Sequence, residues 1–179
     1  MYKRQDKTGT ITRPDMSVSD VVFLKDNVGK LIAGVAGNMD DDNETMKAIK
    51  NYYHITGRDN SAERVYSFSS QNKYSGAVLD GRCYIFGAPE YVLLDTYAEY
   101  EDIFERYSGH GERILVFGEC VGDPCGNIIE EAVNPYAFII LENEIRDTAK
   151  ETFGYFASQG VDTVSYTHLR AHETRHDLV

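Results

Sequence analysis

The first part of the chain alternates apolar runs with amphipathic stretches, a pattern that predicts both strands and helices. An apolar run at 18–24 predicts a strand, whereas apolar residues recurring at helical spacing predict a helix over 27–36. A second helix is expected after the aspartates at 40–42, because acidic residues before a helix cap and stabilise its N-terminus. These aspartates lack the ligand spacing and downstream glutamate of a calcium loop.

From position 64 onward the pattern changes to short strands, which favours an antiparallel sheet. The dipeptide Asp80-Gly81 lies between two of these strands and is typical of a tight hairpin turn. The elements expected in this part are strands at 64–69, 74–79, 82–86, 113–117 and 136–141, helices at 89–94, 98–107 and 147–159, and a loop at 118–135.

Composition narrows the classes of protein that the chain can represent. Of its 179 residues 42% are hydrophobic, which is enough for a packed core, and its net charge of −11 argues against a nucleic-acid-binding face. No window has the apolar length of a membrane-spanning helix and no signal peptide opens the chain, so the chain by itself is expected to be soluble. Cys83, Cys120 and Cys125 lack the spacing of a metal site and are expected to remain reduced thiols.

Both ends of the chain have sequences that translated transposase-end sequencing adapters would encode. Residues 1–5 read MYKRQ, and residues 164–179 begin VSYTHLRAHET, so both segments are predicted to be adapter-derived. The second segment contains three histidines at helical spacing, and its predicted origin argues against a zinc site there. The biological sequence is then expected to run from 6 to 163.

The string DKTGTIT at 6–12 carries the chemistry of phosphoryl transfer. The carboxylate of Asp6 can act as a nucleophile toward a phosphate, and the adjoining glycine lets the backbone approach the transferring group. Lys7, Thr8 and Thr10 offer a charge and hydroxyl donors for phosphate oxygens. The alternative interpretation is a surface turn with an acidic helix cap, since these residue types also favour turns.

This string resembles the phosphorylation signature of P-type ion-pumping ATPases. The resemblance implies a catalytic domain of haloacid-dehalogenase-like fold in which Asp6 takes the γ-phosphate of ATP, while Asp6 and the Thr8 carbonyl help to hold Mg²⁺. In that family a buried strand comes directly before the aspartate. Because MYKRQ stands in its place, the first strand of the phosphorylation domain is expected to be absent.

A second group of residues resembles the nucleotide-binding domain of the same family. In FSSQNK at 68–73, Phe68 would stack on adenine, with Ser69 beside it, and Lys73 would approach the base edge or the phosphates. Without the DKTGT string, Phe68 would be interpreted as a core aromatic residue. The family's Lys-Gly-Ala-Pro-Glu motif appears at 86–90 with Phe in place of Lys, and its Gly87 and Ala88 are expected at the nucleotide.

Four further positions match the family by their surroundings. Arg113 in ERILVFG is expected to reach the phosphates or bridge two domains, and Glu44 is expected to contact the adenine amino group. Asn143 and Arg146 fall in the segment that returns to the phosphorylation domain, where Arg146 would pair across the hinge. A plain surface charge is the alternative for both arginines.

The resemblance predicts an α/β chain, with an α+β nucleotide-binding domain containing an antiparallel sheet inserted in an incomplete haloacid-dehalogenase-like phosphorylation domain. The expected divisions are an adapter-derived 1–5, the start of the phosphorylation domain at 6–24, the nucleotide-binding domain at 25–135, the return segment at 136–163, and an adapter-derived 164–179.

The function expected from the resemblance is that of a fragment of an ATP-driven cation pump. Its cofactors would be ATP and Mg²⁺. Its partners would be ATP and, in the intact protein, a transported cation. A hard cation is favoured, because the His-Pro pair of soft-metal pumps is not found. The intact parent would be a membrane-bound ATP hydrolase and translocase with this region in the cytoplasm, whereas the fragment by itself is not expected to turn over. The alternatives are a free-standing dehalogenase-superfamily phosphatase and a non-catalytic nucleotide-binding module.

Overall fold

The computed structural model describes residues 2–6, 12–40, 43–108, 112–125, 127–145, 155, 158 and 162–166. The chain divides into two compact units, of which the larger is Met16–Glu142 and the smaller combines Met1–Asp15 with Asn143–Val179. The predicted helix at 147–159 lies outside the described residues apart from Tyr155 and Ser158, both of which are helical.

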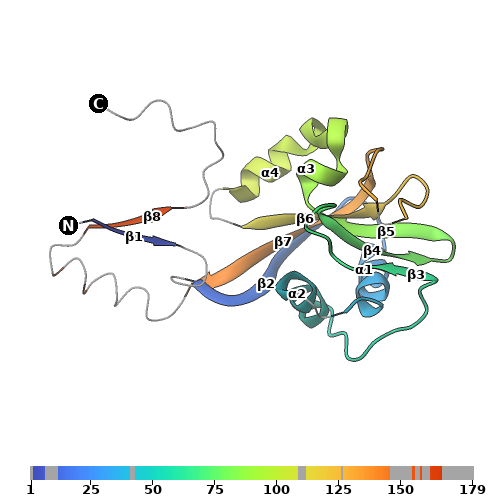
Figure 1. Cartoon of the computed structure of the whole chain (residues 1–179), viewed down its shortest axis with the longest axis horizontal. Coiled ribbons are helices and arrows are strands. Elements are labelled where there is room, and N and C mark those ends of the chain that lie inside the picture. Colours follow the sequence, from blue (N-terminus) through green and yellow to red (C-terminus); the bar gives the residue numbers. More distant parts are fainter. Residues whose placement is uncertain are drawn as a thin grey trace. The chain divides into compact units, whose positions relative to one another are not determined.

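The larger unit is built on a six-stranded sheet that is covered by helices on both faces (Figure 1). In spatial order the strands are β2 (Thr12–Phe23), β7 (Asn134–Ile145), β6 (Arg113–Glu119), β5 (Arg82–Gly87), β4 (Tyr74–Leu79) and β3 (Arg64–Tyr66). Each neighbouring pair from β3 to β7 is antiparallel. The predicted antiparallel sheet and mixed α/β class are therefore confirmed.

The two long strands β2 and β7 lie side by side at one edge of this sheet and run in opposite directions. The backbone N–H of Leu24 donates to the carbonyl of Tyr136 at 2.9 Å, and the hydroxyl of Ser19 donates to the carbonyl of Ile140 at 3.4 Å. Because both strands belong to its sheet, the larger unit is wider than the predicted nucleotide-binding domain of 25–135.

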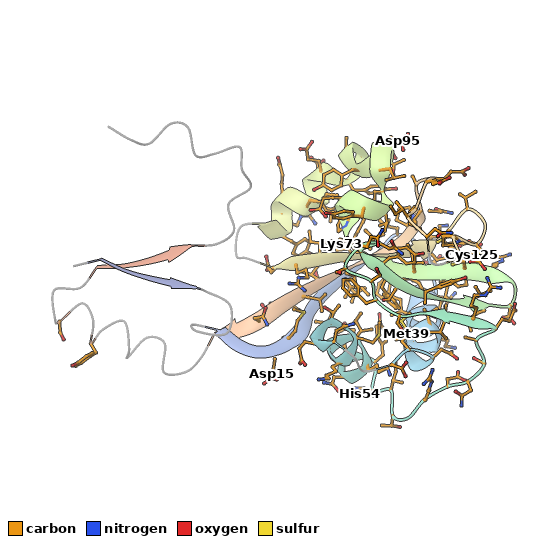
Figure 2. The ribbon with its side chains drawn as sticks, in the orientation of Figure 1. Asp15, Met39, His54, Lys73, Asp95 and Cys125 are labelled. Carbon is orange, nitrogen blue, oxygen red and sulfur yellow. The ribbon has the colours of Figure 1, made fainter. Side chains whose placement is uncertain are left out.

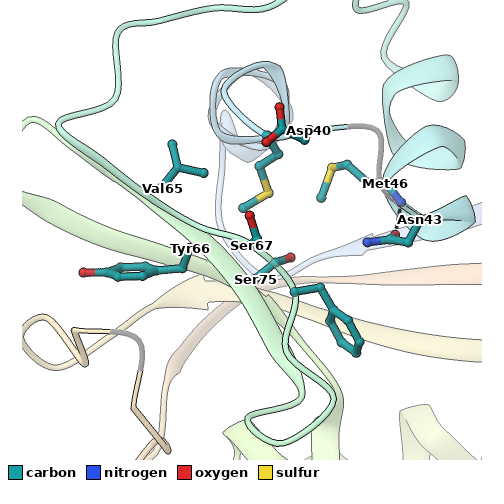
Figure 3. Close-up of a pocket in the computed structure, with 9 residues that line it drawn as sticks. Asp40, Asn43, Met46, Val65, Tyr66, Ser67 and Ser75 are labelled. Atoms are coloured by element: carbon teal, nitrogen blue, oxygen red, sulfur yellow. Dashed lines mark hydrogen bonds between the residues drawn. The ribbon is translucent and has the colours of Figure 1, made fainter.

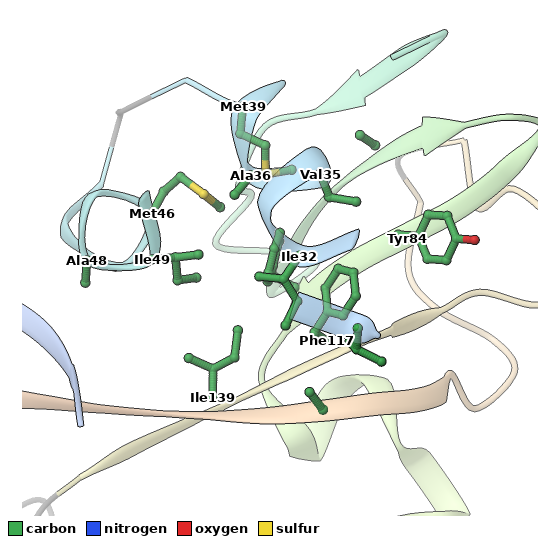
Figure 4. Close-up of a cluster of buried hydrophobic side chains, with 14 of the residues drawn as sticks. Ile32, Val35, Ala36, Met39, Met46, Ala48, Ile49, Tyr84, Phe117 and Ile139 are labelled. Carbon is green, nitrogen blue, oxygen red and sulfur yellow. The ribbon is translucent and has the colours of Figure 1, made fainter. Parts of the chain in front are cut away.

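The first face of the sheet packs against α1 (Val28–Gly37) and α2 (Glu44–Tyr52). Figure 4 shows Ile32 and Val35 of α1 above the aromatic ring of Phe117, which lies 4.9 Å from the Phe86 ring. All four side chains are at most 2% exposed, as expected for apolar residues that recur at helical spacing and face alternate residues of a strand.

The second face packs against α3 (Pro89–Val92), the 3-10 helix η1 (Leu94–Tyr100) and α4 (Glu101–Ser108). Phe138 of β7 is fully buried there, and its ring lies 5.4 Å from the ring of Phe104 and 5.1 Å from the ring of Tyr100. The sheet therefore separates two apolar layers, and successive residues of β7 alternate between them.

The predicted hairpin turn is confirmed. Asp80 and Gly81 both have positive φ, at 50° and 70°, which is the backbone that a two-residue turn between antiparallel strands requires. Several predicted boundaries differ: the strand at 64–69 ends at Tyr66, the helix at 89–94 ends at Val92, and the helix at 98–107 begins at Glu101, after the seven residues of η1.

The cap of α2 is the asparagine that follows the aspartate run. The side-chain oxygen of Asn43 accepts a hydrogen bond from the Met46 N–H at 2.9 Å, which satisfies one donor of the first helical turn. Asp40 instead forms an ion pair with Arg58 at 2.6 Å. Among the described residues of this segment, the cap is thus Asn43 and not an aspartate, because α2 begins after the aspartate run ends. Positions 41 and 42 of that run lie outside the described residues.

The smaller unit contains a parallel pair of strands, β1 (Tyr2–Asp6) and β8 (Asp162–Tyr166), in a register that joins Tyr2 to Asp162 and Asp6 to Tyr166. The expectation that no strand precedes Asp6 is therefore wrong, because ladder hydrogen bonds use the backbone and do not depend on the side chains of MYKRQ. The adapter origin of 1–5 and 164–179 concerns the encoding DNA and stays a prediction.

Candidate nucleotide pocket

A small pocket, open to solvent, lies where α1 ends, α2 begins and β3 leaves the sheet (Figure 3). Its lining combines apolar and polar side chains, namely Met39, Asp40, Asn43, Met46, Val65, Tyr66, Ser67, Phe68 and Ser75. Apolar walls with a few polar groups are the usual composition of a small-molecule site.

The wall formed by the helices is rigid because its parts are fixed by packing and hydrogen bonds. Met39 and Met46 are 3% and 2% exposed, so their thioethers form a packed floor. The ammonium group of Lys50 donates to the Met39 carbonyl at 2.6 Å and thereby holds the chain that leaves α1 against α2. Asn43 is held in place by capping α2.

The opposite wall is the turn that follows β3. The hydroxyl oxygen of Ser69 accepts from the N–H groups of Gln71 and Asn72 at 3.2 and 3.4 Å, and the Lys73 N–H donates to the Ser69 carbonyl at 2.8 Å. Ser69 therefore organises the turn and is not among the described residues that line the pocket. Phe68 lies at the start of this turn with 49% of its surface exposed, so one side of its ring is available to a ligand.

The two sequence motifs of the predicted site meet in the fold. The carbonyl of Lys73 accepts a hydrogen bond from the Ala88 N–H at 3.1 Å, which ties the FSSQNK turn to the start of α3. Lys73 has a positive φ of 60°, and its ammonium group lies 5.9 Å from the centre of the Tyr91 ring (Lys73 is labelled in Figure 2). A cation at this position stays mobile enough to approach an anionic ligand.

Gly87 has a packing role that the motif alone did not indicate. A Cβ at this position would lie 2.3 Å from Cγ1 of Val92 and 3.2 Å from Cβ of Tyr74, so only glycine lets α3 pack this closely on the strand. Phe86, directly opposite Ser75 in the β4–β5 pair, is 2% exposed and packs against Phe117. The aromatic ring that replaces the family's lysine thus lies in the core, on the sheet face that carries the pocket.

Of the predicted nucleotide contacts, Phe68 lines the pocket, whereas Glu44 and Arg113, like Ser69, Lys73, Gly87 and Ala88, are not among its lining residues. The Glu44 carboxylate forms an exposed ion pair with Lys47 at 2.7 Å, whereas Asp40 and Asn43 line the pocket. The acidic run DDNET gives no signal that distinguishes neighbouring positions, which explains this shift. Arg113 is exposed at the start of β6, opposite Leu141, on the face that α1 and α2 cover.

The predicted catalytic and hinge residues belong to the smaller unit. Asp6 is the last residue of β1, at the carboxyl end of a parallel strand pair. The amide of Asn143 donates to the carbonyl of Asp15 at 3.2 Å, which joins the ends of β7 and β2. Lys7, Thr8, Thr10 and Arg146 lie outside the described residues.

A polar cluster near the pocket anchors the loop between β6 and β7, and sequence reasoning missed it because its members are far apart in the chain. The Asp123 carboxylate accepts from the Tyr66 hydroxyl at 2.5 Å, from Arg64 at 2.6 Å and from the Cys125 N–H at 2.8 Å. The Tyr66 hydrogen bond is the largest cause that lowers the pKa of Asp123 below its ordinary 3.8. Burial, followed by the Asp123 bond, raises the pKa of Tyr66 to about 12.

This cluster predicts an acid-dependent contribution to stability. Because the pKa of Asp123 is lowered by folding, its stabilisation is complete above about pH 5 and is lost as the pH falls through the lowered value. Asp123→Asn should therefore lower the melting temperature at pH 7. The difference in melting temperature from the wild type should become smaller as the pH falls toward 3. Asp95→Asn, at an exposed acid of η1 (Figure 2), is the charge-matched control. A constant difference between wild type and Asp123→Asn over this range would contradict the assignment.

Known proteins resemble this chain in sequence and in fold. No family model matches the chain. The calcium-transporting ATPase CtpE of Mycolicibacterium smegmatis is 35% identical over 158 residues, covering 87% of this chain and 20% of that protein. The probable cation-transporting ATPase exp7 of Streptococcus pneumoniae is 30% identical over 164 residues, with the same coverage of 87% and 20%. The chain thus spans about a fifth of the length of these relatives.

Solved structures show the same fold at low sequence identity. A zinc-transporting PIB-type ATPase in its E2.Pi state superposes with a TM-score of 0.58 at 17% identity, over 90% of this chain and 24% of that one. The catalytic domain of the CPx-ATPase CopB-B superposes with a TM-score of 0.56 at 12% identity, over 92% and 52%. The fold is therefore that of a P-type ATPase catalytic region with its nucleotide-binding domain.

Over 87% of its length the chain is similar to a segment of calcium- and cation-transporting ATPases, which agrees with the resemblance found at the DKTGT string. The predicted fold class is confirmed. Among the described residues no helix combines the length and hydropathy needed to cross a bilayer.

Proposed function

We propose that the larger unit binds ATP for a membrane-bound cation pump and that, in the intact protein, the γ-phosphate passes from ATP to Asp6. The pocket at Phe68 is the observation that carries this proposal. It combines an exposed aromatic face, a thioether floor and polar side chains, and it lies on the turn that the ATP-binding motif predicted.

Adenine recognition is assigned to the rim of the pocket. The half-exposed ring of Phe68 offers a stacking surface, and such stacking contributes about 1–3 kcal/mol per base. Asp40 and Asn43 supply acceptors and donors for the edge of the base, a role that the sequence assigned to Glu44. Lys73, tied by its carbonyl to Ala88, follows the stacking ring by five residues and is assigned to the phosphates.

Asp6 is proposed as the phosphorylated residue. In sheets of parallel strands, ligands bind beyond the carboxyl ends, which is where the β1–β8 register puts Asp6. The Asp6 carboxylate and the Thr8 carbonyl are the hard oxygen ligands that suit Mg²⁺, which when bound neutralises charge on the phosphates. Lys7 and Thr10 are proposed to bind phosphate oxygens, and Arg113 to reach the phosphates.

Cation transport is proposed for the whole protein. The acyl phosphate on Asp6 would drive the membrane segments between two states that expose the ion to opposite sides, with this region in the cytoplasm. A hard cation is proposed as the cargo, and the calcium in the name of a relative that is 35% identical supports that choice.

The expected result for Phe68→Ala is ATP binding roughly tenfold weaker than in the wild type, because about 1.4 kcal/mol of stacking is lost. Isothermal titration of the full chain with ATP measures this change. Phe23→Ala is the matched control, since Phe23 is 51% exposed against 49% for Phe68 but lies at the end of β2, outside the pocket lining. Equal affinities of the wild type and Phe68→Ala would remove the adenine assignment.

A further inference from the structure

Cys83 and Cys120 face each other across two neighbouring strands, although 36 residues separate them in the sequence. The β5–β6 register pairs Tyr84 with Glu119, and the next pair outward is Cys83 with Cys120. The Cys120 N–H donates to the Cys83 carbonyl at 2.9 Å, so the pair continues the ladder. Directly opposite residues point to the same face, about 5.5 Å apart at Cα in such a pair, which is within the roughly 4.4–6.8 Å that a disulfide spans.

The two thiols influence each other's pKa in the reduced state. A hydrogen bond from the Cys120 thiol is the largest cause that lowers the pKa of Cys83, with a smaller contribution from the Arg64 guanidinium. The same bond, together with burial, raises the pKa of Cys120. The first proton lost from the pair therefore leaves a thiolate that the second thiol stabilises, and a thiolate is the reactive form of cysteine.

We infer that Cys83 and Cys120 are a redox modification site at which a peroxide forms a reversible disulfide. The thiolate sulfur of the pair attacks one peroxide oxygen, which breaks the O–O bond and, with the proton released by the pair, yields a sulfenic acid and water. The second sulfur then attacks the sulfenic sulfur and expels a second water. Two thiols and one hydrogen peroxide become one disulfide and two waters, so two electrons pass from sulfur to the peroxide.

Solvent reaches this site from the Cys120 side. Cys83 is buried in the second apolar layer at 3% exposure, whereas Cys120 is only partly buried at the point where β6 ends. Cβ atoms in a hydrogen-bonded pair are farther apart than the roughly 3.8 Å mean of disulfides, so the bond is expected to be strained and readily reduced by a dithiol. This combination is typical of a regulatory disulfide.

The disulfide would close a loop around the helices that pack on the second face of the sheet. The segment between the cysteines contains α3, η1, α4 and β6, together with most of β5. Closing a loop of this size restricts the unfolded chain, so oxidation should raise the melting temperature of the larger unit.

Cys125 provides an internal control. It is exposed in the loop between β6 and β7, and its sulfur lies 3.6 Å from a guanidinium nitrogen of Arg64. Reactivity that depended only on exposure would therefore modify Cys125 first, whereas the paired geometry predicts loss of the other two thiols.

The test treats the full reduced chain with one equivalent of hydrogen peroxide, blocks the remaining thiols with iodoacetamide and maps the cysteines by mass spectrometry without reduction. The expected result is a cross-linked peptide pair containing Cys83 and Cys120, about 2 Da lighter than the two reduced peptides, with Cys125 alkylated and with full reversal by a dithiol. Cys125→Ser should give the same cross-link, and Cys120→Ser should give none. A disulfide that includes Cys125, or sulfinic acid at Cys120 without any cross-link, would overturn the inference, as would three alkylated thiols after peroxide treatment.

Discussion

Replacing Phe138 by alanine is expected to lower the free energy of unfolding by about 3–5 kcal/mol, the usual cost of removing a buried phenyl ring. Phe138 is fully buried in β7 and makes an edge-on contact with Phe104 at 5.4 Å and a tilted contact with Tyr100 at 5.1 Å. These contacts attach η1 and α4 to the sheet, and alanine would leave a cavity in the second apolar layer, between the sheet and these helices.

Urea unfolding of the full chain, followed by far-ultraviolet circular dichroism, measures this loss. Phe23→Ala is the control, because a phenyl ring that is 51% exposed contributes far less than a buried one. If both substitutions cost the same, the second apolar layer would not be the packed core described above.

Gly76→Ala is expected to destabilise the chain by roughly 2–3 kcal/mol, since extra volume against a packed backbone forces the strands apart. A Cβ at Gly76 would lie 2.4 Å from the Tyr84 carbonyl oxygen and 2.7 Å from Cγ2 of Ile85. The first of these is a backbone atom in the neighbouring strand β5, so the clash cannot be relieved by a change of rotamer.

Gly34→Ala should change the free energy of unfolding in the opposite direction, toward greater stability, and serves as the matched control. Gly34 lies inside α1, and the nearest atom to an added Cβ is Cδ1 of Leu79 at 4.0 Å. Alanine in a helix interior is about 0.5–1 kcal/mol more favourable than glycine, so this variant should gain stability. Thermal melts of the two variants measure both changes. A higher melting temperature for Gly76→Ala than for the wild type would refute the described β4–β5 packing.

The predictable parts of the fold are those in which the spacing of apolar residues along the sequence matches the pattern of buried side chains in the element. Helix α1 followed from apolar residues at helical spacing, and the β4–β5 hairpin followed from alternation around Asp80-Gly81. The segment at 94–100 was not predictable as a separate element, because its 3-10 helix makes only about two turns of three residues, too few to establish an apolar period. Likewise Asn43 and the three aspartates are all good caps, so their order alone could not fix where α2 begins.

The candidate site was predictable where a motif is local and was missed where contacts join distant segments. The FSSQNK turn provides Phe68 at the pocket, but the lining residues Met39 and Met46 come from two helices and carry no motif. The Asp123 cluster joins positions 59 residues apart, and the Cys83–Cys120 pair depends on the β5–β6 register. The cysteine spacing predicted three reduced thiols and gave no sign of a pair, because spacing along a sequence does not indicate which strands become neighbours.

The antiparallel neighbours β2 and β7 have a consequence for how such a unit can be inserted into other chains. They contain the first and last residues of the larger unit, Met16 and Glu142, so the chain enters and leaves it on adjacent strands, which lie about 4.8 Å apart. A host protein that accepts the unit has to hold its own two ends only one strand spacing apart, and closing so short a gap costs little chain entropy. The same proximity would let a short linker join these ends and new termini open at the exposed turn at Asp80, giving a circular permutant with the same sheet.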